Sequence, residues 1–439
     1  MPESTTLVYV FMGMFGLKMF IDYINRSASR GPYPPGPPPK PLVGNAFDFP
    51  TAWPADGYIE WGKKYNSTVV SAEALGNRII VVNKREDAIE LCERRAKLYS
   101  DRPYIPILNR LSISLTMEMM YGIEIKSADE PCIALAHKAV KLGTDLLMPG
   151  GSLANIVPVL RHIPAWFPGA TSLRKADMIG RMTEEVIRIP VDQVKANFNF
   201  CEQEEGKAAP SFFTNFIEKK QTLGASNEEE EIIRNIAYTV NGAASDTTIS
   251  STGSFFYLMA ANPDVQRKAQ EEIDGLTGSK RLPTLEDRKS LPFVEAIYRE
   301  VMRMRPPLPL GVPHRVTEDN YYKGYLIPKG LNSICDISRA MTHDEEDYPE
   351  PYTFKPERFF DENGKLIGDD RVIAYGFGRR ICVGKHMASS TLWLMMASVL
   401  ACFNIVKAKD ENGNEIDINH EIEDLGLMQY VFVNNFAWV

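Results

Sequence analysis

Runs of apolar positions predict a small sheet near the amino end of the chain and a mostly helical body after it. Residues 67–72 and 78–83 are rich in Val, Ile and Thr and flank the turn signal Gly76-Asn77, so they predict two paired strands. Residues 84–98 repeat apolar side chains at helical spacing and predict an amphipathic helix. We therefore expect a small sheet beside a helical body.

One very long helix is predicted between residues 226 and 262. It opens with Ser-Asn-Glu-Glu, a capping-box pattern, and stops at Asn262-Pro263. About 36 residues at about 1.5 Å each span roughly 54 Å, enough to cross a domain and form the wall of a central cavity. In its middle, Asp246 and Thr247 stand among small and apolar residues, where polar groups are costly to bury. Either they serve a site, or the threonine bonds back to its own helix and Asp246 is salt-bridged.

A second helix is predicted over residues 291–303, which begin with Leu-Pro and carry Glu300 and Arg303 on one face. Ion pairs at this spacing usually decorate solvated surfaces and contribute little. Arg358, however, lies in Phe-Lys-Pro-Glu-Arg-Phe at residues 354–359, a stretch too rich in proline and aromatic residues for a solvated helix. The alternative is a buried Arg–Glu–Arg network that fixes the fold around a site.

Cys382 lies in Tyr-Gly-Phe-Gly-Arg-Arg-Ile-Cys-Val-Gly at residues 375–384. The glycines, Gly378 and Gly384 among them, let the backbone adopt positive φ and approach a flat ligand, and Arg380 and its neighbour supply fixed positive charge. A lone cysteine so placed suits an axial iron ligand. The alternative is a cysteine buried for packing in a glycine-rich turn.

Composition describes a large globular enzyme, because 44% of the residues are hydrophobic and 24% are charged. A net charge of −8 argues against nucleic acid as a partner, and six cysteines without paired spacing suit a reducing compartment. No linker-like stretch follows Asn45, so residues 46–439 are expected to form one catalytic domain. No glycine-rich dinucleotide fingerprint follows a predicted strand.

The amino end predicts a membrane anchor over residues 1–30. Residues 7–21 are nearly all apolar apart from Lys18, and basic residues follow. The run is short against the ~20 residues that cross a bilayer, although Lys18 can snorkel, and a cleaved signal peptide is the alternative. No small-x-small cleavage pattern follows immediately, and the downstream basic residues place the main domain in the cytosol. The proline-rich residues 31–45 are expected to act as a semi-rigid extended hinge.

In this order and separation, the motifs between about residues 226 and 403 resemble the cytochrome P450 family. The proline run at residues 34–45 is similar to the hinge of microsomal members, and Ile-Pro-Ala-Trp-Phe-Pro-Gly at residues 163–169 is similar to members from mushroom-type, basidiomycete fungi. The resemblance implies a mainly α fold with a small β-sheet (α+β). It also implies that haem b lies between the long helix and the helix that begins after Cys382.

The resemblance assigns roles to particular residues. Cys382 matches the thiolate ligand of the haem iron, and Asp246 and Thr247 match the acid–alcohol pair that delivers protons to bound oxygen. His314 matches a residue that contacts a haem propionate, and Arg380 is a second propionate candidate. Tyr375, Gly378 and Gly384 match the cofactor loop. The structural triad is matched by Glu300, Arg303 and Arg358.

The activity implied is that of a haem-thiolate monooxygenase, which inserts one atom of O2 into a small apolar organic molecule. Electrons would come from a separate NADPH–cytochrome P450 reductase. The resemblance places the catalytic domain on the cytosolic side of the endoplasmic reticulum membrane, held by a single-pass anchor. Fungal secondary metabolism or xenobiotic oxidation is the expected context.

Several departures from the family pattern keep other interpretations open. Tyr375 stands where phenylalanine is usual, Ala244 replaces a glycine, and Arg339 replaces a tryptophan. The stretch near residues 103–121 is several dozen residues shorter than in the family, where it carries a loop over the substrate pocket and a helix that binds a propionate. The alternatives are a haem-impaired, non-catalytic paralogue or an incomplete gene-model product. A haem-thiolate isomerase or peroxygenase is a further alternative, although it would not need the Asp-Thr pair.

Overall fold

The computed structural model describes the chain in segments, and every structural statement below concerns these segments alone. They are residues 32–40, 43–50, 54–74, 77–99, 120–123, 135, 138–139, 142, 163–164, 166–167, 170–203, 211–224, 226–331, 333–336, 338–367, 372–410, 413–418, 422–424, 429–431 and 436–438. The predicted anchor at residues 1–30 and most of the shortened stretch at 103–121 lie outside them. Within them, no helix is both long enough and apolar enough to span a bilayer.

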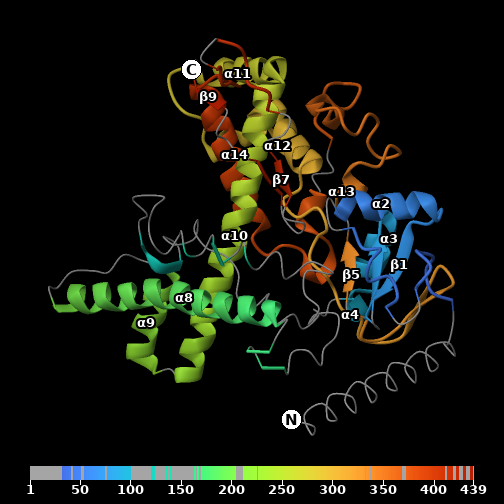
Figure 1. The fold of residues 1–439 in the computed structure, drawn as a ribbon. Coiled ribbons are helices and arrows are strands. Elements are labelled where there is room, and N and C mark those ends of the chain that lie inside the picture. Colours follow the sequence, from blue (N-terminus) through green and yellow to red (C-terminus); the bar gives the residue numbers. More distant parts are fainter. Residues whose placement is uncertain are drawn as a thin grey trace, which may run out of the picture.

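The fold is mostly helical with small sheets, so the predicted α+β class is confirmed. One long helix, α10, runs through the molecule, and a small sheet packs to one side of the helical body (Figure 1). The other helices with seven or more residues are α2 (Pro54–Lys64), α8 (Thr171–Gln203), α9 (Phe212–Leu223), α11 (Pro263–Thr277), α12 (Pro292–Met304) and α14 (Lys385–Cys402). The shorter helices are α3 (Arg85–Ala88), η1 (Ile89–Arg94), α4 (Ala96–Tyr99), η4 (Leu285–Ser290), α13 (Ser338–Thr342), η5 (Pro356–Phe359), η6 (Ile373–Tyr375) and η7 (Gly378–Arg380).

The predicted long helix is confirmed as α10 (Asn227–Ala261), with Ser226 as its N-cap. The Ser226 N–H donates to Glu229 Oε2 at 2.7 Å, and the Glu229 N–H donates to Ser226 Oγ at 3.2 Å, which is the reciprocal pattern of a capping box. These hydrogen bonds to Ser226 lower the pKa of Glu229, because they stabilise its ionised form. The helix ends at Asn262, before the proline that begins α11.

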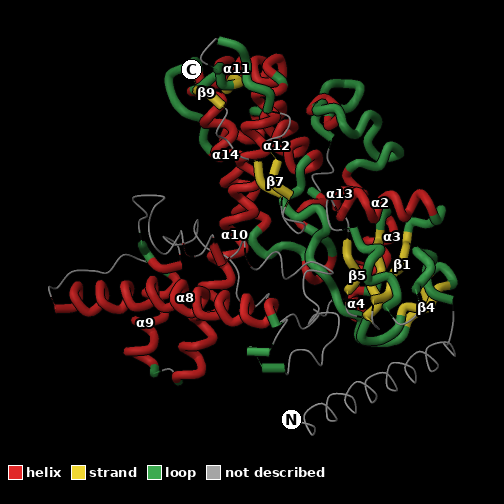
Figure 2. The backbone as a smooth tube through the Cα atoms, in the orientation of Figure 1, coloured by secondary structure: helices red, strands yellow, loops and turns green. Residues whose placement is uncertain are grey.

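The two predicted strands are confirmed as β1 (Val69–Ala74) and β2 (Asn77–Val82), which pair antiparallel with Val70 opposite Val81. The sequence did not predict their third partner, β5 (Ser333–Asp336), which joins β2 in parallel (Figure 2). The remaining strands form three short antiparallel pairs: β3 (Asn320–Tyr322) with β4 (Tyr325–Ile327), β6 (Ile405–Lys407) with β9 (Phe436–Trp438), and β7 (Ile422–Asp424) with β8 (Gln429–Val431).

The helix predicted over residues 84–98 is broken into three pieces. α3 passes into η1, a π-helical stretch, and Arg95 then interrupts the run before α4. π-helical stretches are rare and occur frequently at functional sites. Here η1 is the segment that meets the cysteine loop, as described below.

The described part of the proline-rich segment packs along β1. The Ser71 N–H donates to the Pro35 carbonyl at 2.9 Å, and Ser71 Oγ donates to the Pro34 carbonyl at 2.6 Å. Asn45 ties the end of the segment to the same strand, because its Oδ1 accepts the Glu73 N–H at 3.0 Å. These contacts place the described residues of the segment along the edge strand β1, and the hinge role of residues 31–45 stays a prediction. Prolines suit this position because they offer carbonyl acceptors but no N–H groups.

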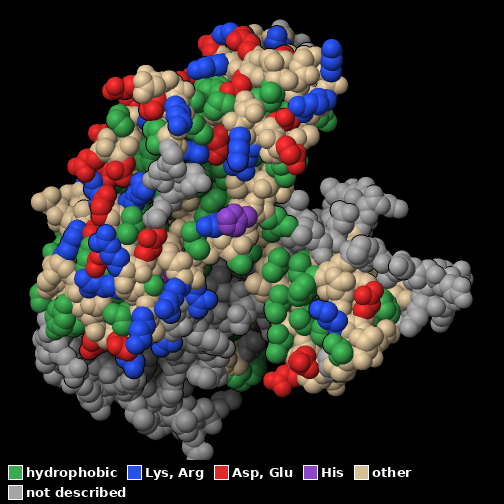
Figure 3. All heavy atoms as spheres, turned by 180° about the vertical axis from the view of Figure 1, so that it is seen from behind, with side chains coloured by type: hydrophobic (Ala, Val, Ile, Leu, Met, Phe, Trp, Pro, Cys, Tyr) green, Lys and Arg blue, Asp and Glu red, His purple; other side chains and the backbone are tan. Residues whose placement is uncertain are grey.

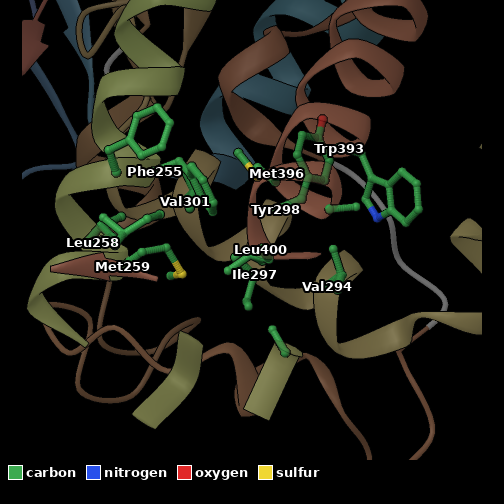
Figure 4. Close-up of a cluster of buried hydrophobic side chains, with 14 of the residues drawn as sticks. Phe255, Leu258, Met259, Val294, Ile297, Tyr298, Val301, Trp393, Met396 and Leu400 are labelled. Carbon is green, nitrogen blue, oxygen red and sulfur yellow. The ribbon is translucent and has the colours of Figure 1, made fainter. Parts of the chain in front are cut away.

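The main hydrophobic core lies where the carboxyl half of α10 meets α11, α12 and α14. Phe255, Met259, Val301 and Trp393 are at most 1% exposed and pack together there (Figure 4). Because α14 begins at Lys385, three residues after Cys382, this core anchors the helix that follows the cysteine loop. The amino half of α10 packs with α8 and α9 instead. Over that lobe, hydrophobic side chains gather at the surface (Figure 3), and the large ones exposed on the amino half of α10 are Ile232, Ile236 and Val240.

Glu230 joins the three helices of this lobe. Its carboxylate accepts from Lys195 of α8 at 2.5 Å and also pairs with Lys220 of α9. The hydrogen bonds from these two lysines lower the pKa of Glu230 to about 2. The side chain of Glu230 is 15% exposed, so solvent screens the pair only in part.

We expect Glu230→Gln to lower the free energy of unfolding at pH 7 by about 1–2 kcal/mol. A carboxyl with a depressed pKa in the folded state stabilises the fold above its unfolded pKa and loses that contribution as the pH falls toward about 2. The difference between wild type and variant should therefore shrink between about pH 5 and pH 2. Urea unfolding across this range measures it, and a pH-independent difference would contradict the ion-pair explanation.

Candidate haem site

The cysteine loop runs from η6 through η7 to the start of α14. The Cys382 N–H donates to the Tyr375 carbonyl at 2.8 Å, which closes the loop. Gly376 and Gly378 both have positive φ, 78° and 60°, as expected for a chain that reverses direction twice in a few residues. Cys382 is exposed. The alternative of a cysteine buried for packing is therefore wrong.

Gly378 must be glycine for a second reason besides its positive φ. A Cβ atom at this position would overlap the carbonyl oxygen of Cys92 in η1, so glycine is required by the packing of the loop on η1. Phe377 beside it is 2% exposed and lies in a buried cluster with Leu91. Gly384, by contrast, faces the sulfur, because a Cβ there would sit 3.8 Å from Cys382 Sγ. Of these two glycines, only Gly384 lies beside the Cys382 sulfur.

The residues near Cys382 in the sequence carry side chains that suit a largely apolar ligand. Three large apolar side chains flank the cysteine in sequence and are exposed: Ile381 by 37%, Val383 by 97% and Met387 by 42%. Exposed apolar side chains gathered beside a sulfur donor are unusual on a soluble surface and typical of a ligand site. Arg380, also exposed, supplies the positive charge that a carboxylate-bearing ligand requires. Sulfur donor, apolar surface and adjacent cation together match what haem needs.

Asp246 and Thr247 lie in the middle of α10. Asp246 is 6% exposed, whereas Ile249 on the same stretch is 47% exposed. Thr247 Oγ1 donates to the Ala243 carbonyl at 2.8 Å, and Thr248 Oγ1 donates to the Ala244 carbonyl at 2.6 Å. Both threonines therefore bond back to their own helix. The sequence predicted this bond as the alternative to a role in a site. Such bonds weaken the local helical hydrogen bonds and commonly bend a helix at that point.

His314 is 7% exposed and is held by α4. Its Nδ1 lies 2.6 Å from the Tyr99 carbonyl oxygen, which can only accept, so Nδ1 carries the proton of this hydrogen bond. The tautomer and ring orientation are thus fixed by the backbone of Tyr99. A propionate contact at His314 stays a prediction.

Glu300, Arg303 and Arg358 come together in one buried network. Arg303 Nε donates to Glu300 Oε2 at 2.7 Å, and Arg358 Nε donates to Glu300 Oε1 at 3.1 Å. The Lys355 N–H donates to the same Oε1 at 2.9 Å. Glu300 has no exposed surface, and the Arg303 and Arg358 side chains are 3% and 8% exposed. The network fastens α12 to the 354–359 stretch and to Thr342 in α13, whose carbonyl accepts from Arg303 Nη1 at 2.7 Å.

A second Arg–Glu–Arg network on α12 escaped sequence reasoning. Glu295 accepts from Arg288 Nε at 2.8 Å and from Arg299 Nε at 3.0 Å, and its side chain is 12% exposed. Arg288 also donates to Ser389 Oγ of α14 at 2.9 Å. The Glu295–Arg299 spacing of four residues was the only local signal, and such pairs are common on helices.

Comparison with known proteins agrees with this geometry. A family model described as "Cytochrome P450" matches residues 105–429. "Cytochrome P450 monooxygenase ple1" of Rhodocybe pseudopiperita is 32% identical over 491 aligned residues, covering 95% of this chain and 91% of the relative. "Cytochrome P450 monooxygenase claR" of Ampulloclitocybe clavipes is 33% identical, covering 95% and 87%. "Tryptamine 4-monooxygenase" of Psilocybe cyanescens is 30% identical, covering 91% of each.

The aligned length with ple1 exceeds the 439 residues of the chain, so the alignment leaves gaps opposite residues of the relative. All three relatives are fungal proteins, in agreement with the resemblance seen at residues 163–169. The family implies a haem cofactor, O2 and a redox partner. The chain therefore belongs to the cytochrome P450 family, and it is a monooxygenase of the fungal type, an oxidoreductase.

Proposed function

We propose that this chain inserts one oxygen atom from O2 into a small apolar organic molecule, and that the Cys382 thiolate would hold the iron of haem b. The observation that carries the proposal is the exposed Cys382 sulfur, set among exposed apolar side chains in a loop closed by the Tyr375 carbonyl. Arg380 and His314 would hold the propionates. When bound, the haem supplies the iron at which O2 is activated, and a thiolate ligand favours cleavage of the O–O bond.

Asp246 and Thr247 would bring protons to the oxygen site. The Thr247 hydroxyl donates its proton to the Ala243 carbonyl, so its oxygen lone pairs are available to accept a hydrogen bond. In this proposal the hydroxyl turns its proton from the carbonyl toward a ligand, and Asp246 resupplies the proton. Positioned acid–base groups of this kind typically contribute 10²–10⁴-fold to a rate.

The redox partner is proposed to be a separate NADPH–cytochrome P450 reductase, because no dinucleotide fingerprint follows a strand in this chain. We further propose an endoplasmic reticulum location through an anchor at residues 1–30, with the catalytic domain at 46–439 on the cytosolic side. Fungal secondary metabolism or xenobiotic oxidation is the proposed setting. One relative carries the name of a small organic substrate, tryptamine, which supports a small molecule as the substrate class.

One observation favours a second candidate. The alignment with ple1 contains gaps in this chain, as a shortened chain would produce. Near residues 103–121, the resemblance implies that the family carries a loop over the substrate pocket and a helix that binds a propionate. A shortened chain is the basis for proposing a haem-impaired paralogue or an incomplete gene-model product. The two candidates differ in one measurable property, which is haem binding through Cys382.

We expect the purified chain, reduced with dithionite under carbon monoxide, to show the red-shifted absorption band of a thiolate-ligated haem. Cys382→Ser should abolish this band. Cys402→Ser is the matched control, because Cys402 is also exposed but lies at the far end of α14, and it should leave the band unchanged. Absence of haem in the wild-type chain would reject the monooxygenase and support the impaired paralogue.

A further inference from the structure

The Tyr375 hydroxyl makes a contact that the usual phenylalanine could not make. It lies 2.9 Å from the hydroxyl of Tyr298, which projects from α12. Tyr298 is 1% exposed and lies in the core beside Trp393 and Met396 of α14 (Figure 4). A phenol pair thus joins the start of the cysteine loop to a helix outside the site.

Tyr298 is itself held in place from the other side. The Arg288 guanidinium lies 5.2 Å from the centre of its ring. Arg288 in turn donates to Ser389 and to Glu295. A continuous chain of polar contacts therefore runs from the Glu295 network to Tyr375.

Tyr375 passes this restraint to Cys382 directly. Its carbonyl accepts the Cys382 N–H at 2.8 Å, so a displacement of residue 375 displaces residue 382. Burial raises the pKa of Tyr375 and of Tyr298 above the usual value of a phenol. Both side chains therefore stay neutral at physiological pH, and one can always donate to the other.

We propose that Tyr298 is a positioning residue for Cys382, acting through the Tyr375 hydroxyl. The proposal rests on the proposed function, in which Cys382 binds the haem iron. Its consequence is that the orientation of the thiolate depends on Tyr298, which belongs to α12 and not to the cysteine loop. The reduction potential of the iron would depend on Tyr298 in the same way.

The test is a double-mutant cycle with Tyr298→Phe, Tyr375→Phe and the double variant. Each change removes one hydroxyl and keeps the ring, so the core packing is retained. The first readout is hydrogen exchange at the Cys382 amide in haem-free protein, and the second is the reduction potential of the haem-loaded protein. Tyr352→Phe is the control, because Tyr352 is 65% exposed and its ring contacts only His343 among the aromatic contacts of the described residues, tilted by 40°.

We expect each single variant to speed exchange of the Cys382 amide about two- to tenfold, the factor that loss of one hydrogen bond gives to a local opening. The reduction potential should shift equally in both single variants and in the double variant, because each of the three removes the same hydrogen bond between the two hydroxyls. Tyr352→Phe should change neither quantity.

The proposal would be overturned if Tyr298→Phe changed amide exchange and reduction potential equally in the presence and in the absence of the Tyr375 hydroxyl. It would also be overturned if both single variants matched the wild type. If neither the wild-type protein nor any variant binds haem, the proposed function fails by itself. The exchange measurement on haem-free protein then still decides whether Tyr298 positions Cys382.

Discussion

Glu300→Ala is expected to lower the free energy of unfolding by about 3–5 kcal/mol, the cost of leaving buried charges without their counter-charge. Glu300 has no exposed surface and accepts from Arg303, Arg358 and the Lys355 N–H. Removing the carboxylate strands two guanidinium groups that are at most 8% exposed. Urea unfolding followed by circular dichroism measures the change, and loss of soluble protein would be its extreme form.

Glu346→Ala is the matched control, because Glu346 also pairs with a lysine, Lys84, but its side chain is 84% exposed. An exposed pair contributes about 0–1 kcal/mol, so this variant should unfold nearly as the wild type does. Glu300→Gln should fall between the two, since it keeps an acceptor for the Lys355 N–H but not the charge. Similar values for Glu300→Ala and Glu346→Ala would show that the buried network does not hold α12 in place.

Asp246→Asn and Thr247→Ala are expected to separate reductant consumption from product formation. Without the acid or the hydroxyl, protons should reach the oxygen site without control, and the rate of product formation should fall about 10²-fold or more. The measurement is product formed per NADPH oxidised, with reductase added and a substrate found by screening small apolar molecules. The thiolate band under carbon monoxide should persist in both variants, because neither residue belongs to the cysteine loop.

Thr248→Ala is the control for this experiment. Thr248 lies on the same helix and also donates to a carbonyl four residues back, so its loss disturbs the helix as Thr247→Ala does. Coupling should be retained in Thr248→Ala. Equal uncoupling in both threonine variants would point to a general disturbance of α10, and full coupling in Asp246→Asn would remove the proton role and favour the isomerase or peroxygenase.

The sequence by itself determined those features whose physical cause lies within a few residues. The capping box at Ser226 and the proline after Asn262 set both ends of α10, because caps and prolines act on the adjacent turn alone. The proline before Phe293 likewise set the start of α12. Motif order was enough to identify the family, since the cysteine loop and the Glu-Arg pair of α12 are local patterns.

Tertiary structure decided what depends on residues far apart in the chain. Nothing near residue 333 indicates that it will pair with β2, and nothing in the loop indicates that Gly378 must be glycine because of the Cys92 carbonyl. The link from Arg288 through Tyr298 to Tyr375 is also of this kind. Each such contact exists only after helices have packed, because hydrogen bonds and close contacts act over a few ångströms in space, whatever the separation along the chain.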